Sequence, residues 1–167
     1  MSFIEVKGGE IYFIPLFLGD DYSLKNYAKY NFQKKDLEFC FCRIIASEDG
    51  AGILIEIFNH IGPINSTLEN IIESERIIEP IYVAGDGIAK KRWRKIGESQ
   101  GYDKEKNSDY SKIKFILGRG ESKCVWCNGK EFPLENFDDH INIESHKIWT
   151  AAQIENRLIE LIKEKSV

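Results

Sequence analysis

The chain has 167 residues, a length typical of one domain with a single core. Apolar residues make up 43% of it and charged residues 30%, with only 4 prolines. A disordered or fibrous chain is excluded, because this much apolar surface offsets the entropy lost on folding. No apolar run approaches the ~20 residues of a membrane helix, and residues 1–5 lack the basic start of a secretory signal. We therefore expect a cytoplasmic protein that does not insert into a membrane.

The net charge of −4 argues against a general nucleic-acid binder, whose affinity depends on many contacts with phosphates. This charge is distributed unevenly along the chain. Residues 1–87 carry 7 basic and 14 acidic side chains, residues 88–123 carry 11 and 5, and residues 124–167 carry 5 and 8. A basic segment therefore lies between two acidic ones.

Strands are predicted by apolar runs that are rich in β-branched residues, since the chain has 25 isoleucines and 10 leucines. The predicted strands cover residues 10–16, 37–46, 52–58, 77–84, 91–96 and 112–117. Asp49 and Gly50 predict a hairpin turn between the second and third of these runs. Pro15 and Pro80 are expected at strand edges or bulges, because proline cannot donate a hydrogen bond to a neighbouring strand.

Two helices are predicted. Residues 66–69 (STLE) form a capping box that opens a short helix ending near Ser74. Between residues 148 and 162, apolar residues recur at helical spacing on one face, so this helix must pack on another element. Residues 20–32 fit either a helix or a long loop, and residues 97–111 are typical of a long surface loop. Strands in the first two-thirds and helices in the last third indicate an α+β fold.

The strongest local motif is a pair of cysteines followed by a pair of histidines. These residues are Cys124, Cys127, His140 and His146. Their spacing, C-x2-C-x12-H-x5-H, fits a two-cysteine, two-histidine zinc finger. Pro133 fits the first turn of a helix from which the histidines would come. Four such ligands would surround a zinc ion completely, so the site would be structural rather than catalytic.

This segment, residues 124–146, resembles the zinc fingers of the matrin and spliceosomal type. We therefore predict a structural zinc ion and a zinc-finger-like ββα unit here. The alternative is that the four residues have this spacing by accident and that the cysteines lie in a core. The other two cysteines, Cys40 and Cys42, alternate with Phe39 and Phe41 and are expected in a buried strand.

The basic segment admits a different function. The first five basic residues of this segment are Lys90, Lys91, Arg92, Arg94 and Lys95. They surround Trp93, as in proteins that bind single-stranded nucleic acids. A solvated edge strand with Trp93 buried explains the same residues equally well. The finger adds little to DNA recognition, because its base-reading positions would be Pro133, Asn136 and Asp139, none of which is basic.

The sequence contains no convincing catalytic constellation. His60 has no serine or cysteine nucleophile pattern beside it and is expected in a loop. Residues 85–87 (GDG) and 118–120 (GRG) do not extend into a phosphate-binding or dinucleotide-binding motif, so turns are expected there. We predict a protein that is not an enzyme.

Two stretches of the chain resemble a known family. Residues 9–16 (GEIYFIPL), followed by a hairpin that ends in residues 56–59 (EIFN), are similar to the opening of the immunity protein 26 family. Residues 80–85 (PIYVAG), followed by residues 92–97 (RWRKIG), resemble its later strand pair, which ends in a tryptophan and a glycine. The resemblance extends over about residues 8–97.

The resemblance implies a bacterial immunity protein encoded beside a polymorphic toxin. Such a protein binds its cognate toxin in the cytoplasm and occludes it without catalysis. An acidic surface from residues 1–87 would attract a basic toxin domain, such as a nuclease. No residue stands out as a toxin contact. A small zinc-finger protein that binds nucleic acid is the alternative function.

These inferences combine into one architecture. We expect an α+β fold with a mainly antiparallel, strongly curved sheet and a C-terminal helical segment. Residues 1–123 would form the immunity-type sheet domain. Residues 124–167 would form the zinc-finger-like segment with the amphipathic helix packed on it, and the two parts would make one compact unit.

Overall fold

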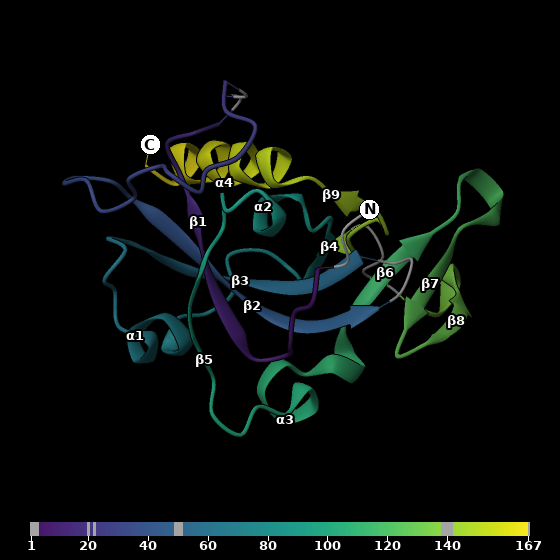
Figure 1. The fold of residues 1–167 in the computed structure, drawn as a ribbon. Coiled ribbons are helices and arrows are strands. Elements are labelled where there is room, and N and C mark those ends of the chain that lie inside the picture. Colours follow the sequence, from purple (N-terminus) through teal and green to yellow (C-terminus); the bar gives the residue numbers. More distant parts are fainter. Residues whose placement is uncertain (1–3, 20, 22, 49–51, 138–141, 167) are drawn as a thin grey trace.

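The computed structural model describes residues 4–19, 21, 23–48, 52–137 and 142–166 (Figure 1). Its strands are β1 (Glu10–Pro15), β2 (Phe39–Glu48), β3 (Gly52–Gly62), β4 (Ile81–Val83), β5 (Lys95–Glu98), β6 (Lys114–Leu117), β7 (Cys124–Cys127), β8 (Lys130–Pro133) and β9 (Ile148–Trp149). Its α-helices are α1 (Leu68–Glu73), α2 (Asp86–Ala89), α3 (Lys104–Ser108) and α4 (Ala151–Lys165). Short 3-10 turns lie at Tyr110–Lys112, Gly120–Ser122 and Leu134–Asn136. The mixture of strands and helices confirms the α+β class.

The strands form two sheets. Six strands follow the order β5-β1-β2-β3-β4-β9, and three follow the order β6-β7-β8. The neighbouring strands are antiparallel except β4 and β9, which are parallel. Figure 1 shows the smaller sheet beside the end of the larger sheet that carries β4 and β9. The prediction of a mainly antiparallel arrangement is therefore confirmed.

Successive side chains of β2 point alternately to the two faces of the larger sheet. Cys40 and Cys42 point to one face, where they pack in a cluster with Ile154 and Leu158 of α4. Phe39, the residue before Cys40, points to the opposite face, as the period of two residues in a strand requires. Both cysteines are almost fully buried, which confirms that they belong to a buried strand.

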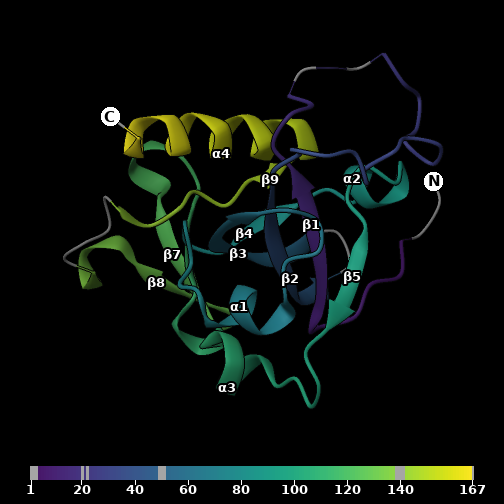
Figure 2. The ribbon, with the colours of Figure 1, turned by 90° about the vertical axis from the view of Figure 1, so that its left-hand side faces the viewer.

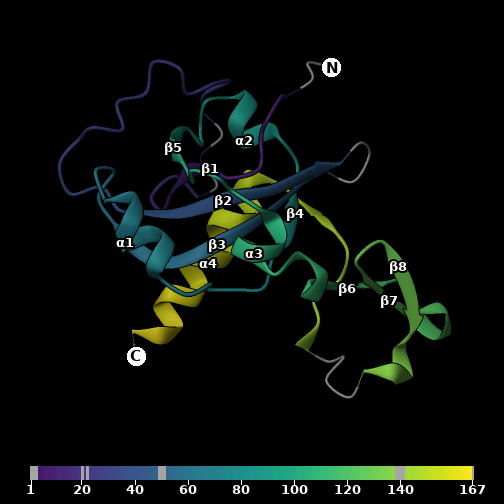
Figure 3. The ribbon, with the colours of Figure 1, turned by 90° about the horizontal axis from the view of Figure 1, so that it is seen from below.

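The opposite face carries two further clusters. At one end, aromatic side chains that include Phe13 and Phe32 pack with Ile71 of α1. At the other end, Tyr82 of β4 packs with Phe115 of β6 and so joins the smaller sheet to the larger one. Figures 2 and 3 show α4 on one side of the six-stranded sheet and α1 and α3 on the other.

The prediction of a strongly curved sheet is wrong. A sheet must curve strongly when it closes around one core, whereas this sheet buries apolar side chains on both faces against separate elements. Part of the strand content also forms the separate three-stranded sheet instead of extending the larger one. The six-stranded sheet therefore remains an open layer between helices.

Local capping explains where the two longer helices begin. Thr67 caps α1 by accepting a hydrogen bond from the backbone N–H of Asn70. Thr150 and Gln153 form a capping box that opens α4. The apolar face of α4 packs on the six-stranded sheet, and its Arg157 also pairs with Glu144 of the segment that precedes it. In addition, β6 pairs with β7 across the predicted boundary between residues 123 and 124.

The segments that the sequence left open also have defined structures. The described part of residues 20–32 contains neither helix nor strand, whereas residues 97–111 contain α3. His60 lies in β3 rather than in a loop.

Among the described residues, no helix has the length and apolar character needed to cross a membrane.

Candidate functional site

The two cysteines of the predicted zinc site lie at the two ends of β7. Positions three apart in an extended strand point to opposite faces, so Cys124 and Cys127 do not converge on one ion. The thiol of Cys127 donates a hydrogen bond to the carbonyl of Ser111, with 3.1 Å between the two atoms. The spacing that would suit a turn around zinc is here part of a strand paired on both sides.

The histidines do not complete the site. The ring of His146 packs against the rings of Tyr82 and Phe115, at centroid distances of 5.1 and 5.7 Å. His140 lies outside the described residues. After β8 the chain forms the 3-10 turn Leu134–Asn136, and its described residues up to His146 contain no α-helix, so the predicted ββα unit is not seen.

Among the described residues, no group of three or more histidine, cysteine, aspartate or glutamate side chains could hold a metal ion. The zinc site therefore stays a prediction that the structure does not support. The segment is instead built as a small antiparallel sheet whose central strand buries Val125.

The basic segment is divided between the interior and the surface. Arg92 is buried and forms a bidentate pair with Glu155 of α4, with Nε–Oε2 and Nη2–Oε1 distances of 2.7 and 2.8 Å. The indole N–H of Trp93 donates to the same carboxylate at 3.0 Å. Burial raises the pKa of Glu155, and the hydrogen bonds from Arg92 and Trp93 oppose that rise. The expectation that Trp93 is buried is confirmed.

The remaining donors of Arg92 hold the chain between β1 and β2. Its guanidinium donates to the carbonyl oxygens of Gly19 and Asp21, at 2.7 and 3.2 Å, and to the hydroxyl of Tyr27 at 3.0 Å. Its guanidinium group also lies over the Tyr27 ring. Arg92 is thus a structural residue whose charge cannot reach a phosphate group in solution.

The other basic residues between positions 90 and 95 fall into two groups. Arg94 donates to the carbonyl of Tyr27 and stacks over the Phe32 ring, and Lys95 pairs with Glu10 at 2.8 Å. Lys90 and Lys91 are exposed and form no salt bridge with any described residue. Because the two arginines are engaged internally, the structure does not favour the alternative nucleic-acid-binding function.

A second buried ion pair lies on the other face of the sheet. Arg43 and Glu56 are cross-strand neighbours, and their Nε and Oε2 atoms are 3.0 Å apart. Arg76 approaches the second oxygen of the same carboxylate at 3.1 Å, and Ser108 of α3 also donates to it. Sequence reasoning missed this group. The signal was a single charge in the middle of each apolar strand of a hairpin.

The buried thiols offer no reactive group. Burial raises the pKa of Cys40 to about 12 and also raises the pKa of Cys42, because a thiolate is poorly solvated in an apolar core. Both thiols therefore stay protonated at neutral pH. Cys124 and Cys127 are partly exposed.

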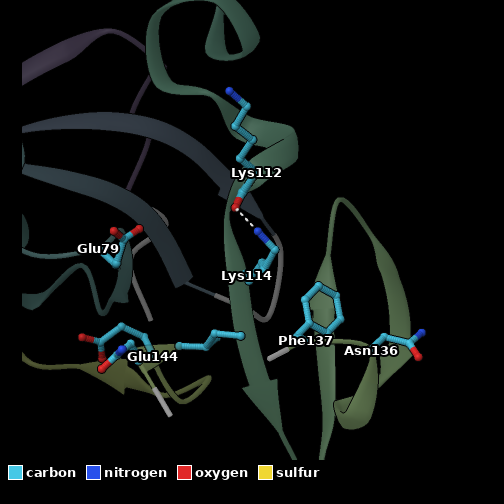
Figure 4. Close-up of a pocket in the computed structure, with 8 residues that line it drawn as sticks. Glu79, Lys112, Lys114, Asn136, Phe137 and Glu144 are labelled. Atoms are coloured by element: carbon cyan, nitrogen blue, oxygen red, sulfur yellow. Dashed lines mark hydrogen bonds between the residues drawn. The ribbon is translucent and has the colours of Figure 1, made fainter. Parts of the chain in front are cut away.

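A cleft of about 520 Å³ lies between the smaller sheet and the edge of the larger one (Figure 4). The residues that line it are Glu79, Lys112, Lys114, Asn136, Phe137, Asn142, Ile143 and Glu144. Glu144 already pairs with Arg157 of α4. The described lining holds no serine, cysteine or histidine, so the cleft can accept a polar group but supplies no nucleophile of these types.

Among known proteins, the chain is similar to a family of immunity proteins. A family model for an immunity protein matches residues 7–123, which is more than half of the chain. The chain belongs to the Immunity protein 26 family. No curated protein and no solved structure matches it. The match spans β1 to β6 and α1 to α3, whereas β7, β8, β9 and α4 follow it.

The buried pair of Arg92 and Glu155 makes a prediction about stability. Replacing Arg92 by alanine leaves the carboxylate of Glu155 buried and unpaired, which costs about 3–5 kcal/mol of the free energy of unfolding. Urea denaturation followed by circular dichroism measures this loss. The matched control is Lys91→Ala, at an exposed neighbouring position, where a change within about 0.5 kcal/mol is expected. Equal losses in the two variants would contradict a central role for the pair.

The four thiols are expected to differ in reactivity. In the native protein, iodoacetamide should alkylate Cys124 and Cys127 and leave Cys40 and Cys42 unmodified, because alkylation requires an accessible thiolate. Mass spectrometry locates the modified sites, and denatured protein is the control in which all four react. Native Cys124 and Cys127 that react only after a chelator is added would instead support the zinc hypothesis.

Proposed function

We propose that this protein binds a cognate toxin in the cytoplasm and neutralises it by covering its active site or a surface that its activity needs. The observation that carries this proposal is the match of residues 7–123 to the Immunity protein 26 family. In this proposal the protein acts as a binding partner and catalyses nothing. Its effect on the toxin is therefore stoichiometric.

The structure supports a binding role because buried ion pairs hold its irregular segments in place. Two buried ion pairs, Arg92–Glu155 and Arg43–Glu56, fix segments that have little regular secondary structure. A surface that is already ordered loses less entropy on association than a flexible one, so more of the contact energy appears as affinity. Immunity requires this affinity, because a free toxin molecule harms the producing cell.

The activity of the toxin is less closely defined. The prediction of a basic nuclease rests on the acidic charge of residues 1–87. In the structure, however, four lysines of this segment are exposed together between β1 and β2: Lys25, Lys29, Lys34 and Lys35. Residues 1–87 therefore do not present a uniformly acidic surface. That the toxin is a nuclease stays a prediction.

The proposal is tested by co-expressing this protein with the product of the neighbouring gene. We expect restored growth and a 1:1 complex that co-purifies, because occlusion requires one inhibitor for each toxin molecule. An unrelated toxin of similar potency is the control and should remain lethal. A neighbouring gene product that is harmless, or that kills in spite of abundant folded inhibitor, would remove the support for this function.

A further inference from the structure

The connection between β1 and β2 is unusual for a compact domain. It covers residues 16–38, and its described part contains neither helix nor strand. Irregular connections longer than about 12–15 residues are uncommon in compact domains and often carry function. We call this connection the β1–β2 loop.

The β1–β2 loop is held from the inside. Arg92 donates to two of its carbonyl oxygens and to the hydroxyl of Tyr27, and that hydroxyl donates to the carbonyl of Asp21 at 2.7 Å. The backbone N–H of Tyr27 donates to the carbonyl of Lys90 at 2.7 Å. The buried ring of Phe32 packs on Phe13, with 4.9 Å between ring centroids. These contacts hold the described part of the loop in place before any partner arrives.

The exposed side chains of the loop include four lysines and, among its described residues, the carboxylates Asp21, Asp36 and Glu38. Lys90, whose carbonyl accepts a hydrogen bond from Tyr27, and the neighbouring Lys91 add two exposed lysines, so lysines are in excess here. The exposed lysines of the loop, with these two, are Lys25, Lys29, Lys34, Lys35, Lys90 and Lys91. Within the described part of the chain, none of them forms a salt bridge. We call these six lysines, together with Leu24 and Tyr30, the lysine surface.

The lysine surface also offers apolar contact. Leu24 is 44% exposed, which makes it one of the few large apolar side chains turned to solvent in the described chain. A hollow of about 750 Å³ opens beside it, and its lining includes Lys29, Tyr30 and Lys34. A largely apolar hollow with two lysines on its lining suits a partner that brings an apolar side chain beside carboxylates.

Exposed carboxylates gather at a different place. Glu69 and Glu73 lie on α1, and Glu75 and Glu79 follow it. In Figure 1, α1 lies below the six-stranded sheet, whereas the β1–β2 loop rises above it. These four glutamates provide the comparison for the test below.

We propose that the lysine surface is the docking site for the toxin, and that the toxin contacts it with a carboxylate-rich surface. This inference rests on the proposed function and specifies which face of the protein carries it out. Lys29 and Lys34 line the same hollow, where their like charges repel one another in the free protein, and an acidic partner removes that repulsion on binding. The ordered loop keeps the entropic cost of docking low.

The test reverses three charges on the loop. The variant Lys25→Glu, Lys29→Glu, Lys34→Glu is expected to bind the product of the neighbouring gene about 100-fold or more weakly than the wild type, because like charges then face one another. Isothermal titration calorimetry measures the dissociation constant with an inactivated form of that product. Thermal melting followed by circular dichroism confirms that each variant is folded.

The matched control changes the net charge equally at another place. The variant Lys106→Glu, Lys123→Glu, Lys130→Glu alters three exposed lysines outside the lysine surface and should bind within about threefold of the wild type. A second variant, Leu24→Ser, removes apolar contact without changing charge and should weaken binding about tenfold.

The outcomes separate the two proposals. A wild-type protein that neither binds nor neutralises the neighbouring product contradicts the proposed function itself. If the wild type binds and the two lysine variants weaken binding equally, the inference is wrong, because net charge alone is then responsible.

It is also wrong if Glu69→Lys, Glu73→Lys, Glu75→Lys abolishes binding while the loop variant retains it. The same holds if the loop variant loses affinity for single-stranded RNA but keeps its affinity for the toxin.

Discussion

The ion pair between Arg92 and Glu155 connects three parts of the molecule that are distant in the sequence. It joins α4 to the connection between α2 and β5 and, through further donors of Arg92, fixes the β1–β2 loop. Two buried charges are costly to desolvate, and this cost is offset only by good geometry and additional hydrogen bonds, as Trp93 supplies here. Arg92 lies within the family match and Glu155 lies beyond it. Residues 124–167 therefore contribute a buried partner to the matched part.

The pair of Arg43 and Glu56 has an equivalent role on the opposite face. Arg43 donates to the backbone carbonyl of Asn107 and to Ser99, and so holds the chain around α3 against the sheet. In both pairs a glutamate orients an arginine, which then binds free backbone carbonyls: Arg92 those of the β1–β2 loop, and Arg43 that of Asn107 in the last turn of α3. This arrangement provides a partner for carbonyls that no helix or strand satisfies. The ordered surface of the protein thus depends on charges placed in its core.

Local patterns predicted the local structure well. The alternation of phenylalanine and cysteine indicated both faces of β2, and the capping pattern of residues 66–69 indicated the start of α1. The apolar spacing indicated α4, but the capping box of Thr150 and Gln153 that begins it was not predicted. The side-chain directions in the basic segment could not be predicted, because Arg92 turns inward toward a glutamate 63 residues away. The spacing of Cys124 and Cys127 suits either a metal-binding turn or a strand. In the structure this segment is a strand because β7 pairs with β6 and β8. The spacing of the two cysteines does not encode that pairing.

The anchors of the β1–β2 loop also explain how one fold can present different surfaces. Arg92 binds the backbone oxygens of Gly19 and Asp21, and Arg94 binds the backbone oxygen of Tyr27. A backbone carbonyl is available whatever side chain its residue carries, so these hydrogen bonds place no demand on the exposed positions between them. Those positions can change charge and size while the loop keeps its shape. The residues that order this surface are therefore separate from the residues that are exposed on it.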